Sequence, residues 1–189
     1  MSDLELTPQT TALVVIDLQK GIVSTPTEPH ASATVVANSA RLARAFRQRG
    51  MPVYLVRVVR TPGAMLQPIA DATPPAGELP ADWSEIVPEM GPEPSDVVIT
   101  KRQWGAFYGT DLELRLRRGG TSTIVMTGIA TTYGVQSTAR VAYELGLQQV
   151  FAEDAMSDRS RESHRASVEF VLKRLGRVRS TDQILAALG

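Results

Sequence analysis

The sequence predicts an α/β protein built as one domain, with a three-layer, doubly wound sheet of about six mainly parallel strands. Its 189 residues, 43% hydrophobic and 21% charged, are enough for one full hydrophobic core. Apolar runs without polar alternation recur along the chain and are typical of strands covered on both faces. Segments with helical spacing separate these runs, as in βαβ units with right-handed crossovers.

The first part of the chain predicts one such unit. Thr11–Ile16 is a continuous apolar run, and we expect a buried strand there. Residues 31–49 place apolar side chains on one face, which predicts an amphipathic helix that stops at Gly50. Residues 51–57 indicate a second strand, with Pro52 at its start, where a missing N–H is tolerated.

Residues 61–95 have a different composition, since eight of the twelve prolines lie there. That density disfavours helices and central strands, and a loop of this length is usually functional or disordered. Because the segment also contains Met65, Trp83, Ile86 and Val87, we expect it to pack as a lid or an oligomer contact. No linker composition and no internal repeat marks a second domain, so residues 1–189 are predicted to form one domain that contains this insertion.

The later part of the chain continues the alternation. Strands are expected at residues 96–100, 122–126, 147–152 and 177–179. Helices are expected at residues 112–118, from residue 135 onward, at 160–175 and at 181–188. Residues that favour helix N-caps, Thr110-Asp111 and Ser180, precede the first and the last of these helices.

Composition narrows the functional classes. Twenty basic and twenty acidic residues give a formal net charge of zero, which indicates no attraction to nucleic acid or to an anionic membrane. No apolar run approaches the length of a bilayer span, and the first residues lack the basic start of a signal peptide, so we expect a cytoplasmic protein. The absence of cysteine excludes disulfides, thiolate metal sites and a cysteine nucleophile. His30 and His164 lack metal-ligand spacing, so we expect two surface histidines, no metal site and no cofactor.

Two charged residues stand directly at the ends of predicted strands. Asp17 follows the first strand, where it is either a turn former or a partly desolvated carboxylate suited to proton transfer. Lys101 follows the third strand, where a lysine is normally a solvated surface charge. Here its neighbours Trp104, Phe107 and Tyr108 could shield it from water and make it a useful cation beside a carboxylate.

The stretch from Val125 to Arg140 is the third candidate. It breaks a buried strand at Gly128 and opens into a helical segment, which directs unpaired N–H groups and the positive end of a helix dipole into one small volume. In an open parallel sheet, the carboxyl ends of the strands share one edge, where ligands bind. The sequence therefore predicts that this stretch, Asp17 and Lys101 form the active site of a hydrolase.

Three motifs make the chain resemble the isochorismatase-like superfamily of hydrolases, which includes nicotinamidases and carbamoylases. They are Ala12-Leu-Val-Val-Ile-Asp-Leu-Gln19, then Ile99-Thr-Lys-Arg-Gln-Trp-Gly-Ala-Phe-Tyr-Gly-Thr-Asp-Leu112, then Thr127-Gly-Ile-Ala-Thr-Thr-Tyr-Gly-Val-Gln-Ser-Thr-Ala139 with Glu153-Asp-Ala155 behind it. They occur in the family's order, cover nearly the whole chain, and are most similar to the uncharacterised YecD-type branch. The resemblance implies a Rossmann-type fold, a small-molecule substrate and a homo-oligomer.

Most members of this superfamily use a triad of Asp, Lys and Cys. Asp17 and Lys101 match the first two residues, whereas Gly134 stands at the position of the cysteine. The resemblance also implies a non-proline cis peptide near residues 129–131, whose N–H groups bind an oxyanion together with those of the helix start. The residues then expected to bind the oxyanion or the substrate are Gln19, Trp104, Phe107, Ala130, Thr131, Thr132, Tyr133 and Gly134.

Glycine at the cysteine position also occurs in the true isochorismatases, which hydrolyse a vinyl ether without a covalent intermediate. The resemblance thus implies that Asp17 acts as a general acid, that water attacks the resulting oxocarbenium, and that Gly134 leaves room for the substrate. The alternative is a catalytically silent protein that keeps the fold for binding or assembly. The two retained charged residues favour the enzyme. A nucleotide-binding protein is poorly supported, because no G-x-G-x-x-G follows the first strand.

Overall fold

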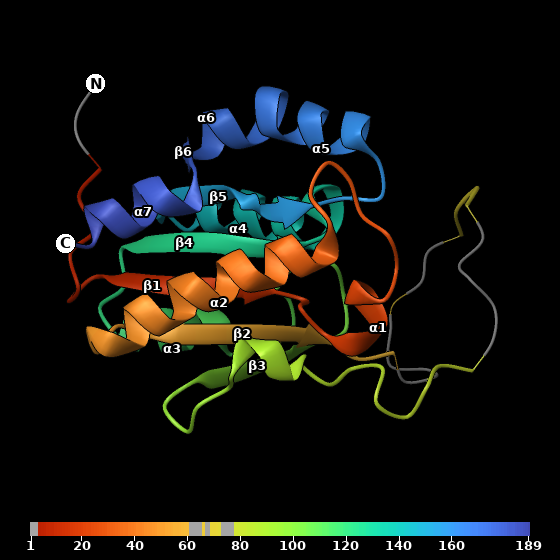
Figure 1. Cartoon of the computed structure of the whole chain (residues 1–189), viewed down its shortest axis with the longest axis horizontal. Coiled ribbons are helices and arrows are strands. Elements are labelled where there is room, and N and C mark those ends of the chain that lie inside the picture. Colours follow the sequence, from red (N-terminus) through yellow and green to blue (C-terminus); the bar gives the residue numbers. More distant parts are fainter. Residues whose placement is uncertain (1–3, 61–65, 67–68, 73–77) are drawn as a thin grey trace.

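A six-stranded sheet lies between two layers of helices in the computed structural model, which describes residues 4–60, 66, 69–72 and 78–189 (Figure 1). Its strands are β1 (Thr11–Ile16), β2 (Val53–Val58), β3 (Val97–Lys101), β4 (Thr123–Ile129), β5 (Gln148–Ser157) and β6 (Arg177–Arg179). They are all parallel and lie in the order β3-β2-β1-β4-β5-β6. The strand order changes direction between β1 and β4, which is where doubly wound sheets bind ligands. The predicted fold class is confirmed.

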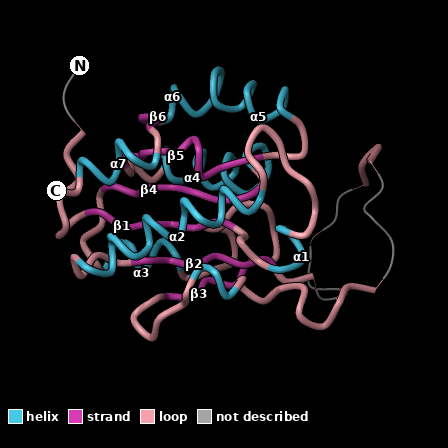
Figure 2. The backbone as a smooth tube through the Cα atoms, in the orientation of Figure 1, coloured by secondary structure: helices cyan, strands magenta, loops and turns pink. Residues whose placement is uncertain are grey.

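The helices divide between the two faces of the sheet (Figure 2). One face is covered by α1 (Lys20–Val23), α2 (Ser32–Gln48), the short 3₁₀ turn η1 (Pro88–Met90) and α7 (Thr181–Ala187). The other face is covered by α3 (Leu112–Arg118), the π-helix η2 (Thr131–Val135), α4 (Gln136–Glu144), and the consecutive segments α5 (Arg161–Ser167), η3 (Val168–Leu172) and α6 (Lys173–Leu175). None of the described helices has the length and apolar character needed to cross a membrane.

The two helix layers enclose separate hydrophobic cores, and β1 contributes to both. Leu13 and Val15 pack in the core that contains Phe46 of α2. Val14 and Ile16 point to the opposite face and pack in the core beneath α3 and α4. Because successive side chains of a strand alternate between faces that are both covered, β1 is apolar at every position from Ala12 to Ile16.

β5 is longer than the sequence predicts. The expected strand ended before Glu153, whereas β5 continues to Ser157. Phe151 pairs with Met126 of β4, but Met156 already pairs with Gly128, so the register shifts within the strand. Such an irregularity re-aims side chains without ending the strand. The strand therefore runs on through acidic residues that locally resemble a strand end.

The described part of the insertion packs against α1. Ile86 forms a β-bridge with Gln19, and Val87 is buried in the core. The ring of Trp83 lies directly against Gly21, where an added Cβ would be 1.9 Å from a ring carbon. Met65 lies outside the described residues, and the role of the segment as a lid or an oligomer contact stays a prediction.

Candidate active site

A buried ion pair lies at the carboxyl edge of the sheet. Lys101 Nζ is 2.7 Å from Asp17 Oδ2, and the two residues are only 1% and 5% exposed. Asp17 directly follows β1 and Lys101 ends β3, so the lysine must reach across β2, over two strand spacings of about 9–10 Å in total. Lys101 is therefore not the solvated surface charge that a lysine at a strand end usually is.

The backbone of Asp17 is also unusual. Its φ is 54°, a left-handed value that no other non-glycine residue in the described part of the chain adopts. Its N–H donates to the carbonyl of Val56, 2.9 Å away on β2. A non-glycine residue is held in this region at a cost, and such residues gather at functional sites.

Burial raises the pKa of Asp17 to about 6, against the opposing effects of the charge and hydrogen bond of Lys101. Within the described residues, Asp17 Oδ1 is buried and has no hydrogen-bond partner. Lys101 Nζ also donates to the carbonyl oxygen of Trp104 at 2.6 Å. Asp17 can therefore carry a proton near neutral pH on Oδ1, which makes no hydrogen bond within the described part of the protein.

The turn after β4 packs against the ion pair of Asp17 and Lys101. The Ile129–Ala130 peptide is cis, as the resemblance implies. A Cβ added to Gly134 of η2 would lie 3.0 Å from Asp17 Oδ2 and 3.4 Å from Lys101 Nζ. The same atom would lie only 2.7 Å from Ile16 Cγ2. The expectation that Gly134 leaves room for a substrate in this direction is wrong, since Ile16 and the ion pair fill the space.

The chain has close relatives among known proteins. A family model described as the isochorismatase domain matches residues 11–183. The chain belongs to the isochorismatase family. It is 52% identical to the uncharacterised isochorismatase family protein YecD of Escherichia coli O157:H7, covering 98% of this chain and 100% of that protein. It is 50% identical to the uncharacterised family protein YwoC of Bacillus subtilis, covering 98% and 97%. The predicted superfamily and branch are confirmed.

A solved structure agrees with these relatives. An isochorismatase family protein from Burkholderia thailandensis superposes with a TM-score of 0.93 at 45% identity and covers 99% of both chains. The six-stranded sheet and its helix layers are thus those of the isochorismatase family.

The aromatic residues of this isochorismatase-family site differ in exposure. Trp104 and Tyr133 are 61% and 47% exposed and meet edge to face, with ring centroids 4.9 Å apart. Phe107 is buried in the core beside α3. Tyr108 is 66% exposed, and its shielding of Lys101 from water stays a prediction. Contact of Trp104, Phe107 and Tyr133 with a ligand stays a prediction.

The predicted polar ligands already bond to the protein. The amide of Gln19 donates to the carbonyls of Val58 and Trp83 and accepts from the N–H of Val58. The hydroxyl of Thr131 donates to the carbonyl of Ser157. Thr132 donates from its N–H and its hydroxyl to Asp158 Oδ2, at 2.6 and 2.8 Å. These contacts hold the loops around the ion pair in place; contact of these residues, and of the partly buried Ala130, with an oxyanion or a substrate stays a prediction.

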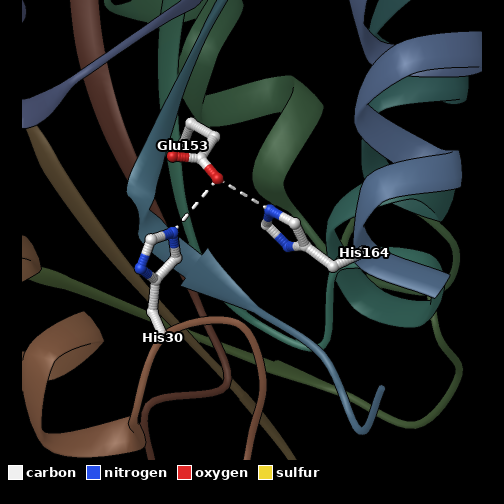
Figure 3. Close-up of side chains that lie close together, drawn as sticks. All are labelled: His30, Glu153 and His164. Atoms are coloured by element: carbon white, nitrogen blue, oxygen red, sulfur yellow. Dashed lines mark hydrogen bonds and ion pairs between the residues drawn. The ribbon is translucent and has the colours of Figure 1, made fainter. Parts of the chain in front are cut away.

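The sequence missed one cluster beside the site. His164 is only 3% exposed, and both histidines contact the same oxygen of Glu153 (Figure 3), so the expectation of two surface histidines is wrong. The three residues come from a loop, β5 and α5, far apart along the chain. No local spacing could have revealed them. The available signal in the sequence was the pair of acidic residues, Glu153 and Asp154, after an apolar run. In the structure, Asp154 accepts hydrogen bonds from the N–H and the hydroxyl of Thr181 at the start of α7. Glu153 contacts the two histidines.

Proposed function

We propose that the chain is a hydrolase that cleaves a vinyl ether, or a related bond, in a small molecule by acid-base activation of water. The observation that carries this proposal is the buried pair of Asp17 and Lys101 directly against Gly134, a position with no nucleophilic side chain. The relative named "Probable isochorismatase" from Pseudomonas chlororaphis supports this class of substrate. It is 28% identical over 98% of this chain and 89% of its own length.

The proposed reaction begins with the protonated carboxyl of Asp17. Its proton passes to the terminal carbon of the vinyl ether, and the carbon bonded to oxygen becomes an oxocarbenium. Water adds to that carbon and returns one proton to Asp17, and the resulting hemiketal separates into an alcohol and a carbonyl compound. One water is consumed and the acid is regenerated. Positioned acids of this kind contribute about 10²–10⁴-fold in rate.

Lys101 acts on the charge that this cycle creates. When Asp17 gives up its proton, a carboxylate forms in a buried space, and the ammonium 2.7 Å away stabilises it. The same ammonium prevents the pKa of Asp17 from rising beyond the range useful near neutral pH, because its charge opposes the effect of burial. The pair thus supplies an acid that is protonated before the reaction and whose carboxylate is stabilised after the proton is transferred.

A silent binding or assembly protein would have no use for this pair. Buried ion pairs are often no more stabilising than apolar side chains of similar volume, because both charges lose their hydration. Here the pair is combined with a left-handed aspartate and a buried carboxyl oxygen without a partner. Three unfavourable features at one ligand edge favour catalysis over packing.

The test is turnover of isochorismate, simple vinyl ethers and small amides by purified wild-type protein and by Asp17→Asn. We expect turnover of a vinyl ether and a loss of at least about 10²-fold in kcat/KM in the variant. Asp96→Asn is a matched control, since the side chain of Asp96 is also buried and ion-paired, 2.7 Å from Arg47 on α2. It should keep the activity at temperatures where it is folded. Equal activity in Asp17→Asn would remove Asp17 from the mechanism, amide cleavage alone would contradict the substrate class, and no turnover would favour the silent protein.

A further inference from the structure

His30, Glu153 and His164 bring three metal-ligating atoms together beside the turn after β4. Nε2 of His30 and Nε2 of His164 lie 3.1 and 3.0 Å from the same oxygen, Oε1 of Glu153. The three atoms all lie within 4.8 Å of one another (Figure 3). The two rings approach edge to face, with centroids 5.9 Å apart. Side chains from three distant segments thus converge on one small volume.

The hydrogen bonds of Thr131 fix how the ring of His164 is protonated. The hydroxyl of Thr131 has one proton, and it is directed at the carbonyl of Ser157, which can only accept. Thr131 Oγ1 therefore accepts from Nδ1 of His164, 2.9 Å away. In the neutral ring, the lone pair of Nε2 then faces the carboxylate of Glu153. Two acceptors 3.0 Å apart repel each other unless a cation, either a proton or a metal ion, lies between them.

Metal-ligating histidines have this arrangement. Their second ring nitrogen usually donates to an oxygen, which fixes the tautomer and leaves the other nitrogen free to bind the ion. Glu153 supplies the third ligand atom, because its Oε1 lies between the Nε2 atoms of the two histidines.

The distances also suit coordination. Two ligand atoms about 2.05 Å from a metal ion lie about 2.9–3.3 Å apart when the angle between them is about 90–109°. The observed separations of 3.0 and 3.1 Å fall in this range. The side chains of His30 and Glu153 keep 27% and 35% of their surface exposed, which leaves a route from solvent.

We propose that Nε2 of His30, Oε1 of Glu153 and Nε2 of His164 bind one divalent transition-metal ion, with water in the remaining position. Two imidazoles and one carboxylate favour Zn²⁺, Co²⁺ or a similar ion over Mg²⁺ and Ca²⁺, which prefer oxygen ligands.

The loop that carries His30 is held in place for this role. The N–H of His30 donates to Oγ of Ser157 at 3.2 Å. Glu28 and Asp158 exchange two backbone hydrogen bonds of 2.9 and 3.0 Å, which attach the loop to the residue that follows β5. These bonds attach the loop that carries His30 to the end of β5, beside Glu153. The ion would join this loop, β5 and α5, and through Thr131 it would brace η2, which carries Gly134.

The chain allows an unambiguous test. Its two histidines both lie in this cluster and it has no cysteine, so imidazole coordination of Co²⁺ by protein without an affinity tag reports this cluster. We expect equilibrium dialysis to show one tightly held Zn²⁺ per chain, and Co²⁺ to give visible absorption bands of a site with nitrogen ligands. His30→Ala and Glu153→Gln should each weaken binding by at least about 100-fold. Glu162→Gln, which alters an exposed carboxylate of α5, should leave binding unchanged.

Two results would overturn the proposal. One is failure of the wild-type protein to retain Zn²⁺ at micromolar concentration, which would leave the cluster as a protonated hydrogen-bonded link. The other is retention that His30→Ala and Glu153→Gln do not change, which would place the ion elsewhere. Circular dichroism of both variants shows whether they are folded, and His30→Gln replaces the imidazole with a polar side chain if alanine unfolds the loop. These outcomes do not depend on whether the Asp17 site is active.

Discussion

The raised pKa of Asp17 should make the free energy of unfolding depend on pH. The ordinary value of 3.8 and the folded value of about 6 differ by an amount equivalent to about 3 kcal/mol. Because the folded state holds the proton more tightly, this contribution to stability is fully present below pH 3.8 and is lost as the pH rises through about 6. Between pH 4.5 and 8 the loss from this one group is about 2 kcal/mol.

The comparison needs a variant that carries neither charge, because Asp17→Asn alone would leave Lys101 buried without its partner. Asp17→Asn/Lys101→Met meets this requirement, and neutral replacement of a buried ion pair is often tolerated. Urea unfolding of both proteins at several pH values gives the difference in unfolding free energy. Groups that titrate in both proteins cancel in that difference.

We expect the wild type to lose about 2 kcal/mol relative to the double variant between pH 4.5 and 8. The loss should centre on the acid side of neutrality, where the folded carboxyl titrates. A difference that stays constant within about 0.5 kcal/mol would show that burial does not raise the pKa of Asp17. The acid role proposed for this residue would then lose its physical basis.

Two further predictions concern the same site. In wild-type protein, kcat/KM for any substrate turned over should fall about tenfold per pH unit above about 6, because only protonated Asp17 can donate; a profile that is flat from pH 6 to 8 would contradict this. Gly134→Ala should lower the free energy of unfolding by about 1–3 kcal/mol, since the new Cβ would lie 2.7 Å from Ile16 Cγ2. Gly105→Ala is the control, because its Cβ would meet Ser137 at 3.7 Å and should cost less than about 1 kcal/mol in the same urea titration. Equal losses in the two variants would show that the space at Gly134 is not filled.

Much of the fold could be predicted from the sequence because its main signals are local. β1 occupies the predicted residues, since an apolar run covered on both faces needs no information from elsewhere in the chain. The ends of parallel strands share one edge, so the convergence of Asp17 and Lys101 followed from their positions alone. Helix α7 begins at the predicted cap, where Ser180 and Gln183 form a capping box.

The features that were missed depend on contacts between distant segments. The extension of β5 comes from a register shift against β4, which no pattern within 147–157 encodes. The burial of His164 depends on Thr131 and Glu153, which lie in other elements. The lack of space beside Gly134 is due to the side chain of Ile16, which lies at the end of β1. Each of these required knowledge of which elements face each other.

The reach of Lys101 across β2 has a consequence for when the ion pair forms during folding. The two charges come from strands that are not neighbours, and the turn that covers them follows β4 on the far side of β1. Four strands must therefore be paired before the ion pair and its cover exist together. A compound that binds there would stabilise only molecules whose central sheet is complete, so its effect on melting temperature would report assembly of both halves of the fold.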